Sequence, residues 1–166
     1  MLGTEAEARG ICLKLLTARP CSRAELADAL RKRGIPEDIG ESVLDRLGEV
    51  GLVDDVAFAE AAVHSGYTYR GLGRKALSAE LRRRGVPDAV AREAVAEVQP
   101  EEEEQRAREL VRRKLRATTA PDVNTLVRRL AGMLARKGYS EGLALRVVRE
   151  ELGPGGWPAE VEPEPG

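Results

Sequence analysis

The chain has 166 residues and a net charge of −1; 33% of its residues are charged and 3% are aromatic. No apolar run is long enough to cross a bilayer, and the N-terminus lacks the apolar core of a signal peptide, so we expect a cytoplasmic protein with no membrane partner. Cys12, Cys21 and the single His64 are too few for a standard zinc site, so we expect buried structural thiols and neither a metal nor another cofactor. Because aromatic side chains are scarce, Leu, Val and Ala must fill the core, which favours small helical bundles over a β-sandwich.

One short pattern occurs three times along the chain. Leu30–Pro36 reads Leu-Arg-Lys-Arg-Gly-Ile-Pro, Leu81–Pro87 reads Leu-Arg-Arg-Arg-Gly-Val-Pro, and Leu134–Ser140 reads Leu-Ala-Arg-Lys-Gly-Tyr-Ser. Each copy follows a leucine four positions earlier and precedes an apolar residue five positions after its glycine. A period of about fifty residues is typical of tandem supersecondary units, which favour an extended binding surface over one catalytic cleft.

The first repeat reads as three helices. Apolar residues recur every three or four positions over Ala8–Leu16, which predicts an amphipathic helix. Ser22 and Glu25 form a capping-box pattern that opens a second helix, and Gly34 ends it in the left-handed conformation. A third helix is predicted over Pro36–Val50, since proline is tolerated in the first turn and Gly51 ends the helix.

The second repeat follows the same design. Helices are predicted over Asp54–Ser65, Leu72–Arg84 and Pro87–Val98, with Asp54 as the cap of the first. The segment Gly66–Gly71 between the first two helices is bounded by glycines, and we predict that it is a loop.

The third repeat starts at an acidic run that suits a helix N-terminus. Its helices are predicted over Glu101–Ala117, Asp122–Arg136 and Ser140–Leu152, and the Pro/Gly/Glu-rich tail has too little apolar surface to fold. We therefore predict an all-α protein of three tandem three-helix, helix-turn-helix-like repeats that form an elongated curved body. The predicted divisions are residues 1–53, 54–100 and 101–152, and a disordered tail, 153–166.

Basic residues gather in the second and third repeats. From Arg106 to Arg149 there are twelve Lys or Arg and three acidic residues. Cations in the last turn of a helix also complement its dipole by about 0.3–1 kcal/mol each, and a solvated charged face is a further alternative. Their accumulation predicts a surface for a phosphate backbone or an acidic protein groove. The candidate contact residues are Arg74, Lys75, Arg82, Arg83, Arg84, Arg108, Arg112, Arg113, Lys114, Arg116, Arg128, Arg129, Arg136 and Lys137.

Two features limit where an acidic partner can bind. In the first repeat the acidic residues of Glu37–Glu41 can neutralise Arg31–Arg33, so we predict a structural role for that basic turn. A DNA-reading helix presents Asn, Gln, Ser or Arg to base edges, whereas Pro36–Val50 and Pro87–Val98 expose mainly Asp and Glu. Base readout by these helices is therefore not expected.

The sequence offers little support for catalysis. It lacks a phosphate-binding loop of the Walker type, and Gly71-x-Gly73 is too short to count as one. His64 has no cysteine or serine partner at an interpretable spacing, and helix capping explains Asp54–Asp55. We therefore expect a binding protein and no enzyme; a hydrolase would require that changes at these three residues abolish turnover.

Three ordered motifs carry a resemblance to a known family. Leu52–Ala59 contains paired aspartates followed by Phe-Ala. Gly71–Val86 contains a glycine, a Glu-Leu pair and a basic-Gly-Val turn, and Arg128–Ser140 ends in Leu-Ala-Arg-Lys-Gly-Tyr-Ser. Together the motifs resemble those of the RecX family of recombinase regulators, and the similarity covers roughly Glu7–Leu152.

The resemblance implies three three-helix repeats and a non-enzymatic role. Family membership implies binding to the RecA–DNA filament and inhibition of ATP hydrolysis and strand exchange, in homologous recombination, DNA repair and the SOS response. We expect a monomer that binds single- or double-stranded DNA more weakly; the alternative is a general nucleic-acid-binding helical protein that acts on DNA itself. The chain departs from the family pattern at His64–Tyr69, where members often carry basic residues. Tyr67 and Tyr69 could stack on a base or on another side chain.

Overall fold

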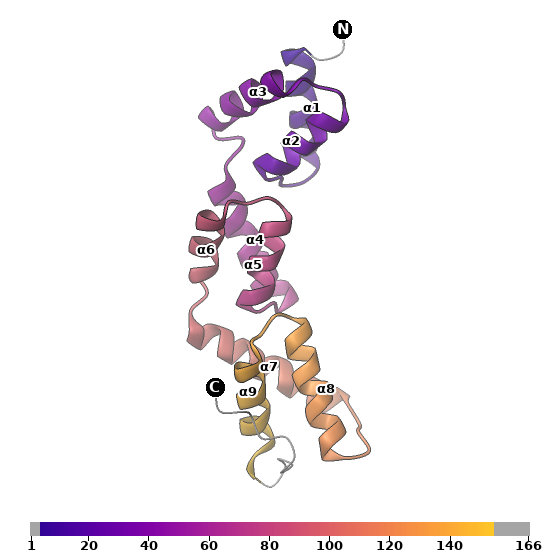
Figure 1. The fold of residues 1–166 in the computed structure, drawn as a ribbon. Helices are drawn as coiled ribbons and strands as arrows, with labels where there is room; N and C mark the ends of the chain where they lie inside the picture. The colour runs from indigo at the N-terminus through magenta and orange to yellow at the C-terminus, as the bar shows by residue number, and fades with distance from the viewer. Residues whose placement is uncertain (1–3, 155–166) are drawn as a thin grey trace. The chain divides into compact units, whose positions relative to one another are not determined.

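The computed structural model describes residues 4–154 (Figure 1). In that range the chain forms nine α-helices and no strand, as the all-α prediction requires. The helices are α1 (Glu5–Ala18), α2 (Arg23–Lys32), α3 (Glu37–Glu49), α4 (Asp55–Arg70), α5 (Arg74–Arg83), α6 (Asp88–Ala96), α7 (Pro100–Ala117), α8 (Val123–Arg136) and α9 (Glu141–Leu152). The first, second and third repeats contain α1–α3, α4–α6 and α7–α9. Most of the predicted tail, from residue 155, lies outside the described residues.

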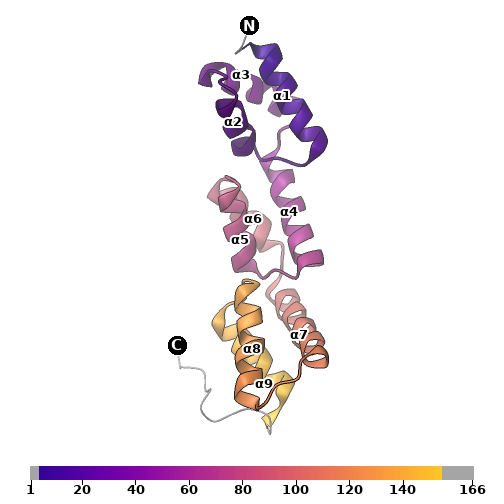
Figure 2. The ribbon, with the colours of Figure 1, turned by 90° about the vertical axis from the view of Figure 1, so that its right-hand side faces the viewer.

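The first and third repeats are three-helix bundles, shown from a second direction in Figure 2. In each, the first and second helices both pack on the third: α1 and α2 on α3, and α7 and α8 on α9. Cys12 is fully buried in the first core, as the helical spacing predicts. The most buried side chains of the two cores are Ala8, Cys12, Leu26, Leu30 and Leu44 in the first and Ala107, Val111, Val127, Leu130, Leu134, Val147 and Val148 in the third.

The chain divides into two compact units that cut across the helices of the second repeat. One unit contains the residues up to Val63 together with Glu80–Ala94, and the other contains His64–Ala79 together with the residues from Val95 onward. Helices α4, α5 and α6 therefore contribute to both units. Each unit contains one terminal bundle with the parts of the second repeat that belong to it.

The predicted loop at Gly66–Gly71 is wrong, because α4 continues to Arg70. Gly66 is buried inside the helix, and a Cβ at this position would lie 2.6 Å from the Leu77 Cδ2 atom of α5. Glycine therefore favours close packing of the Leu77 side chain against α4 and does not end this helix. The turn comes at Gly71, whose φ is +64°.

The helix caps that the sequence predicts are present. The Ser22 hydroxyl accepts a hydrogen bond from the Glu25 N–H at 3.1 Å, and the Glu25 carboxylate accepts one from the Ser22 N–H at 3.0 Å. Asp54 Oδ1 accepts a hydrogen bond from the Ala57 N–H at 3.1 Å. Pro36 is the N-cap of α3, one residue before the helix begins.

The repeated glycine turn has the same backbone geometry in all three copies. Gly34, Gly85 and Gly138 have φ values of +79°, +80° and +92°, in the left-handed region that favours glycine. In each copy the glycine N–H donates to the carbonyl three residues earlier, and the next N–H donates to the carbonyl five residues earlier. This is the pattern that closes a helix at a left-handed glycine.

In the first compact unit the second copy of the turn packs on the N-terminus of α2, a contact that we call the first joint. The buried Ser22 hydroxyl donates to the Arg84 carbonyl. The Arg84 guanidinium donates two hydrogen bonds of 3.0 Å to the Glu25 carboxylate and lies 4.4 Å from the centre of the Phe58 ring. Burial alone would raise the pKa of Glu25, but the hydrogen bonds from Arg84 and the Ser22 backbone outweigh it, so the pKa is lowered.

In the second compact unit the third copy packs on the N-terminus of α5, a contact that we call the second joint. The Gly73 N–H donates to the Lys137 carbonyl at 2.8 Å, and the Lys75 N–H donates to the Gly138 carbonyl at 3.2 Å. The Lys137 ammonium donates to the Arg70 carbonyl at 3.0 Å, where α4 ends. The turn therefore contacts the ends of two helices.

Both joints supply acceptors to backbone N–H groups that a helix N-terminus leaves without partners. In the first joint the Arg23 N–H donates to the Asp55 carboxylate of α4 at 2.9 Å. In the second, the N–H of the equivalent Arg74 donates to the Glu103 carboxylate of α7 at 2.6 Å. Each joint thus combines a glycine turn with an acidic side chain near the start of the first helix of the same repeat.

The glycines also permit the close approach in both joints. A Cβ on Gly85 would overlap the Cβ of Ala24, and a Cβ on Gly138 would overlap the backbone N and the Cβ of Ala76. A Cβ on Gly34, in contrast, would meet no atom within 4 Å.

We expect Gly138→Ala to destabilise the chain more than Gly34→Ala. Both variants place an alanine at positive φ, at a cost of about 1–2 kcal/mol, but only Gly138→Ala also overpacks a joint, which adds about 1–3 kcal/mol. Urea unfolding followed by circular dichroism compares them. Equal losses in the free energy of unfolding would contradict the tight second joint.

We expect Arg84→Gln to lower the free energy of unfolding by about 1–3 kcal/mol, because it removes charge-assisted hydrogen bonds to a partly buried carboxylate. The matched control is Arg83→Gln, since Arg83 is exposed and forms no ion pair with a described residue; its effect should stay within about 0.5 kcal/mol. The same urea titration measures both. A loss no larger for Arg84→Gln than for the control would remove Arg84 from the first joint.

Candidate interaction surface

The structure separates the candidate contact residues by what each side chain already contacts. Arg84 and Lys137 take part in the two joints. Arg74 is half-buried, and its Nε atom is buried without a hydrogen-bond partner among the described residues. Arg82 forms an exposed ion pair of 3.5 Å with Asp88, which contributes little. Of the candidates in the second repeat, only Lys75 and Arg83 are exposed without an ion pair to a described residue.

Two arginines of α7 form ion pairs with α9. Arg108 pairs with Glu104 at 2.9 Å, with Glu151 at 3.4 Å and with Glu150. Arg112 pairs with Glu151 at 2.9 Å. The hydrogen bond with Glu150 raises the pKa of Arg108, and the hydrogen bond from Arg112 lowers the pKa of Glu151. These acids lie just outside the segment in which the basic excess is counted, which is why the sequence overstates the free positive charge.

A further arginine of α7 also has a structural role. Arg106 donates to the Thr68 carbonyl of α4 at 2.6 Å and pairs with Glu109 at 3.2 Å. Ala107 and Val111 are fully buried on the opposite side, as the helical spacing predicts. The N-terminal and middle cations of α7 therefore hold this helix in place.

The remaining cations of the third repeat are exposed. No side chain among the described residues pairs with Arg113, Lys114 or Arg116 at the C-terminal end of α7, or with Arg128 or Arg136 on α8. Arg129 is exposed as well, and it donates to the Thr119 carbonyl at 3.2 Å. We call these side chains the third-repeat cations; they are Arg113, Lys114, Arg116, Arg128, Arg129 and Arg136.

The two tyrosines at the end of α4 differ in exposure. The Tyr67 hydroxyl donates to the Glu102 carbonyl at 2.9 Å, and burial raises its pKa. Tyr69 is 77% exposed and lies edge-on to His64, with 6.3 Å between the ring centres. Tyr67 therefore packs within the fold, while Tyr69 remains accessible to a partner.

The basic turn of the first repeat is only partly neutralised. Arg31 pairs with Asp28 and Glu37, both at 3.6 Å, and Lys32 pairs with Asp28 at 2.9 Å. The predicted neutralisation by the acidic residues of Glu37–Glu41 holds for Arg31 alone, because Lys32 pairs with Asp28 of its own helix instead. Arg33 is exposed and forms no ion pair with a described residue.

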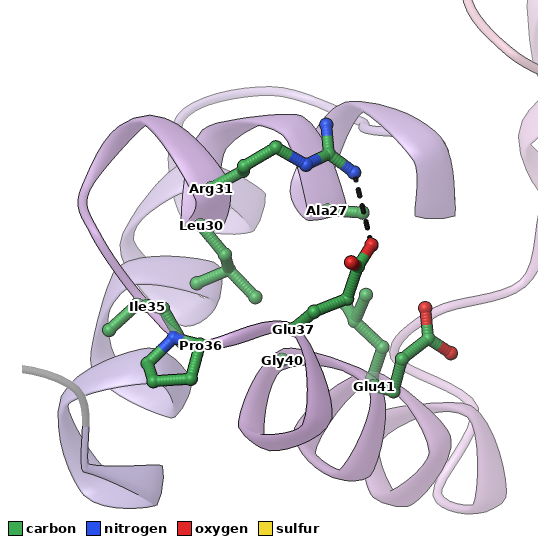
Figure 3. A pocket seen from close by; sticks show the side chains of 9 residues that line it. Ala27, Leu30, Arg31, Ile35, Pro36, Glu37, Gly40 and Glu41 are labelled. Atoms are coloured by element: carbon green, nitrogen blue, oxygen red, sulfur yellow. Dashed lines mark ion pairs between the residues drawn. The ribbon is translucent and has the colours of Figure 1, made fainter.

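A hollow of about 240 Å³ lies beside this turn, between α2 and α3 (Figure 3). Leu30, Ile35 and Pro36 form much of its apolar lining, and the Arg31–Glu37 ion pair extends across it. The volume is sufficient for one large apolar side chain. The repeated pattern of the sequence gives no sign of this hollow, which depends on how the helices pack.

The described residues do not form a catalytic constellation. No group of three His, Cys, Asp or Glu among them could hold a metal ion. Asp54 caps α4 and Asp55 accepts the Arg23 N–H, so both carboxylates have structural roles. Cys12 and Cys21 are buried free thiols, and burial raises the pKa of Cys12. In the described part of the chain, no helix has the length and apolar character needed to cross a membrane.

Comparisons with known proteins match this arrangement in order along the chain. The models of the first, second and third three-helix domains of RecX match residues 8–47, 54–95 and 101–148. The regulatory protein RecX of Thermobifida fusca is 59% identical over 147 residues, which cover 89% of this chain and 80% of that protein. The regulatory protein RecX of Mycolicibacterium smegmatis is 50% identical over 153 residues, which cover 89% of this chain and 81% of that protein.

Solved structures show the same fold. The crystal structure of RecX from Lactobacillus salivarius has a TM-score of 0.76 at 20% identity and covers 88% of this chain and 95% of that one. A second crystal structure of a regulatory protein RecX has a TM-score of 0.77 at 21% identity, with coverages of 86% and 72%. The three matched helix triplets and the high identity to RecX proteins agree with the motifs of the sequence: the chain belongs to the RecX family.

Proposed function

We propose that this regulatory protein binds the RecA–DNA filament and inhibits its ATP hydrolysis and strand exchange. It would do so in the cytoplasm as a monomer, and so modulate homologous recombination, DNA repair and the SOS response. The observation that carries the proposal is membership of a family whose curated relatives are regulatory proteins. The described residues form helical repeats and no catalytic constellation, which also fits a protein that acts by binding.

The third-repeat cations are the charges that such a partner can use. Arg108 and Arg112 are committed to α9, so an acidic partner would have to break existing ion pairs to recruit them. No described residue pairs with Arg113, Lys114 or Arg116, so within the described part of the chain these side chains require no such exchange. These exposed cations suit the phosphates of the filament DNA or acidic side chains of RecA, with an affinity that falls as salt rises.

The same cations favour a second candidate function, direct binding to DNA. A pure DNA-binding protein would bind naked DNA tightly and inhibit RecA only by covering the DNA. A filament regulator would inhibit at concentrations well below those that coat the DNA. The two functions therefore differ in how much protein is needed for inhibition.

We expect the DNA-dependent ATPase rate of the cognate RecA to fall when this protein is added in amounts far below saturation of the DNA. A titration of the ATPase, beside a naked-DNA binding curve in the same buffer, measures both quantities. Inhibition that appears only when the DNA is coated would leave direct DNA binding as the function. An ATPase rate that never changes would contradict the proposal.

We expect the double variant Arg113→Glu/Lys114→Glu to weaken filament binding about tenfold or more while the fold stays intact, because both side chains are exposed and pair with no described residue. The control is Arg9→Glu/Lys14→Glu on α1, which makes the same charge change on exposed residues of the first repeat. Fluorescence anisotropy on labelled filaments measures affinity, and circular dichroism checks folding. Unchanged binding by the first variant would exclude this end of α7 from the interface.

A further inference from the structure

We infer that the turn of the first repeat, Arg33–Pro36, is a docking surface for the N-terminus of a helix in a protein partner. The inference rests on the proposed function only for the identity of that partner, the RecA filament. The surface itself follows from a comparison of the three copies of the glycine turn.

Two copies of the turn already contact a helix N-terminus, by the same chemistry. The carbonyl before the glycine accepts a hydrogen bond in both joints: Arg84 from the Ser22 hydroxyl, and Lys137 from the Gly73 N–H. The basic side chain at that position also finds an acceptor in both, the Glu25 carboxylate for Arg84 and a helix-end carbonyl for Lys137. The turn is thus a repeated structural element that presents carbonyl acceptors, one cation and a glycine without a side chain to the end of a helix.

The first copy has the same geometry and no such contact. Its glycine has the same φ and the same internal hydrogen bonds as the other two. No described residue donates a hydrogen bond to the carbonyl of Arg33 or Gly34. Asp28 and Glu37 pair with the neighbouring Arg31 and Lys32, whereas the exposed Arg33 side chain forms no ion pair with a described residue.

The hollow beside this turn is a second, independent feature of the surface. Gly40 contributes to its lining from within α3, where glycine is less favourable than alanine by about 1 kcal/mol. A Cβ on Gly40 would meet only the Leu30 Cδ1 atom, at 3.5 Å, so internal packing does not require glycine. The corresponding positions of the second and third repeats are the buried Ala91 and Ala144. The hollow next to Ile35 and Pro36 therefore suits an apolar side chain that the partner helix brings along (Figure 3).

The two joints define the chemistry of the partner. A helix N-terminus supplies an N–H donor or a cap hydroxyl for the Arg33 carbonyl, as Gly73 and Ser22 do at the equivalent carbonyls of the joints. A further N–H can reach the Gly34 carbonyl, as the Lys75 N–H reaches that of Gly138 in the second joint. A small residue must face the glycine, because Gly85 and Gly138 both meet alanines. A carboxylate in the first turn would pair with Arg33, as Glu25 pairs with Arg84.

Nucleic acid and a second copy of this chain fit the surface less well. A phosphate would pair with Arg33 but has no hydrogen to donate to the two carbonyls. In a second copy, α8 is the helix that corresponds to α2 and α5. Its register, set by Leu26 and Leu130, places Arg128 and Arg129 at the positions of Ala24 and Glu25. Those cations would repel Arg33.

Two variants test the surface in the full chain. Arg33→Glu reverses the unpaired charge, and Gly34→Asn adds a side chain that the left-handed conformation tolerates and that has open space in the free protein. The matched control is Lys14→Glu, an equal charge change on the same repeat. Each protein is measured for binding to RecA filaments and to naked DNA, for self-association by sedimentation velocity and for thermal unfolding.

We expect both variants to bind filaments at least tenfold more weakly than the unmodified protein and the control, with naked-DNA affinity unchanged within twofold. If the unmodified protein binds filaments and both variants bind as well as it does, the docking surface is wrong while the proposed function stands. If the unmodified protein does not bind filaments, the proposed function fails, and this partner with it. A parallel loss of DNA binding would make the turn a nucleic-acid contact, and a dimer that Arg33→Glu dissociates would make its occupant a second copy; either result overturns the inference.

Discussion

The fold depends on the hydrogen-bond donors that a helix N-terminus leaves unpaired. Helices α2 and α5 have ten residues each, a length that is marginal for an isolated helix. In the second compact unit the next copy of the glycine turn and Glu103 accept hydrogen bonds from the first N–H groups of α5. In the first unit Asp55 accepts the Arg23 N–H of α2, and the glycine turn accepts the hydroxyl of the Ser22 cap. The left-handed glycine makes this possible, because it closes one helix and allows the turn to approach the backbone of another.

In this arrangement many basic side chains form contacts within the protein and are not free to bind a partner. Arg84 and Lys137 complete the joints, and Arg108 and Arg112 fix α7 against α9. A basic excess counted along the sequence is therefore larger than the charge that a partner can reach. The charge that is left for binding concentrates at the C-terminal end of α7 and on α8, where the third-repeat cations form no ion pair with a described residue.

Structural features that depend on a few neighbouring residues were predictable from the sequence. The capping box of Ser22 and Glu25 and the left-handed turn at Gly34 depend on neighbouring residues alone. Features that depend on distant contacts were not. Gly66 looks like a turn residue until Leu77 is placed against it, and Arg112 looks available until Glu151 is placed beside it. Both features have one cause, since a local pattern does not encode the partner that tertiary packing brings.

The same distinction separates Arg33 from Arg84 and Lys137, the residues at the same position of the other two repeats. Those two side chains have partners from distant parts of the chain, and Arg33 has none among the described residues. Its glycine turn is fixed by internal hydrogen bonds before any partner arrives, so docking requires little further ordering of the backbone. The third-repeat cations are long, solvated side chains whose attraction acts at a distance and weakens with salt. If the proposed function and docking surface hold, two surfaces of different physical character divide the work of recognition. Diffuse charge would then accelerate the encounter with the charged filament, whereas a rigid turn with oriented acceptors would select a helix end over a phosphate backbone.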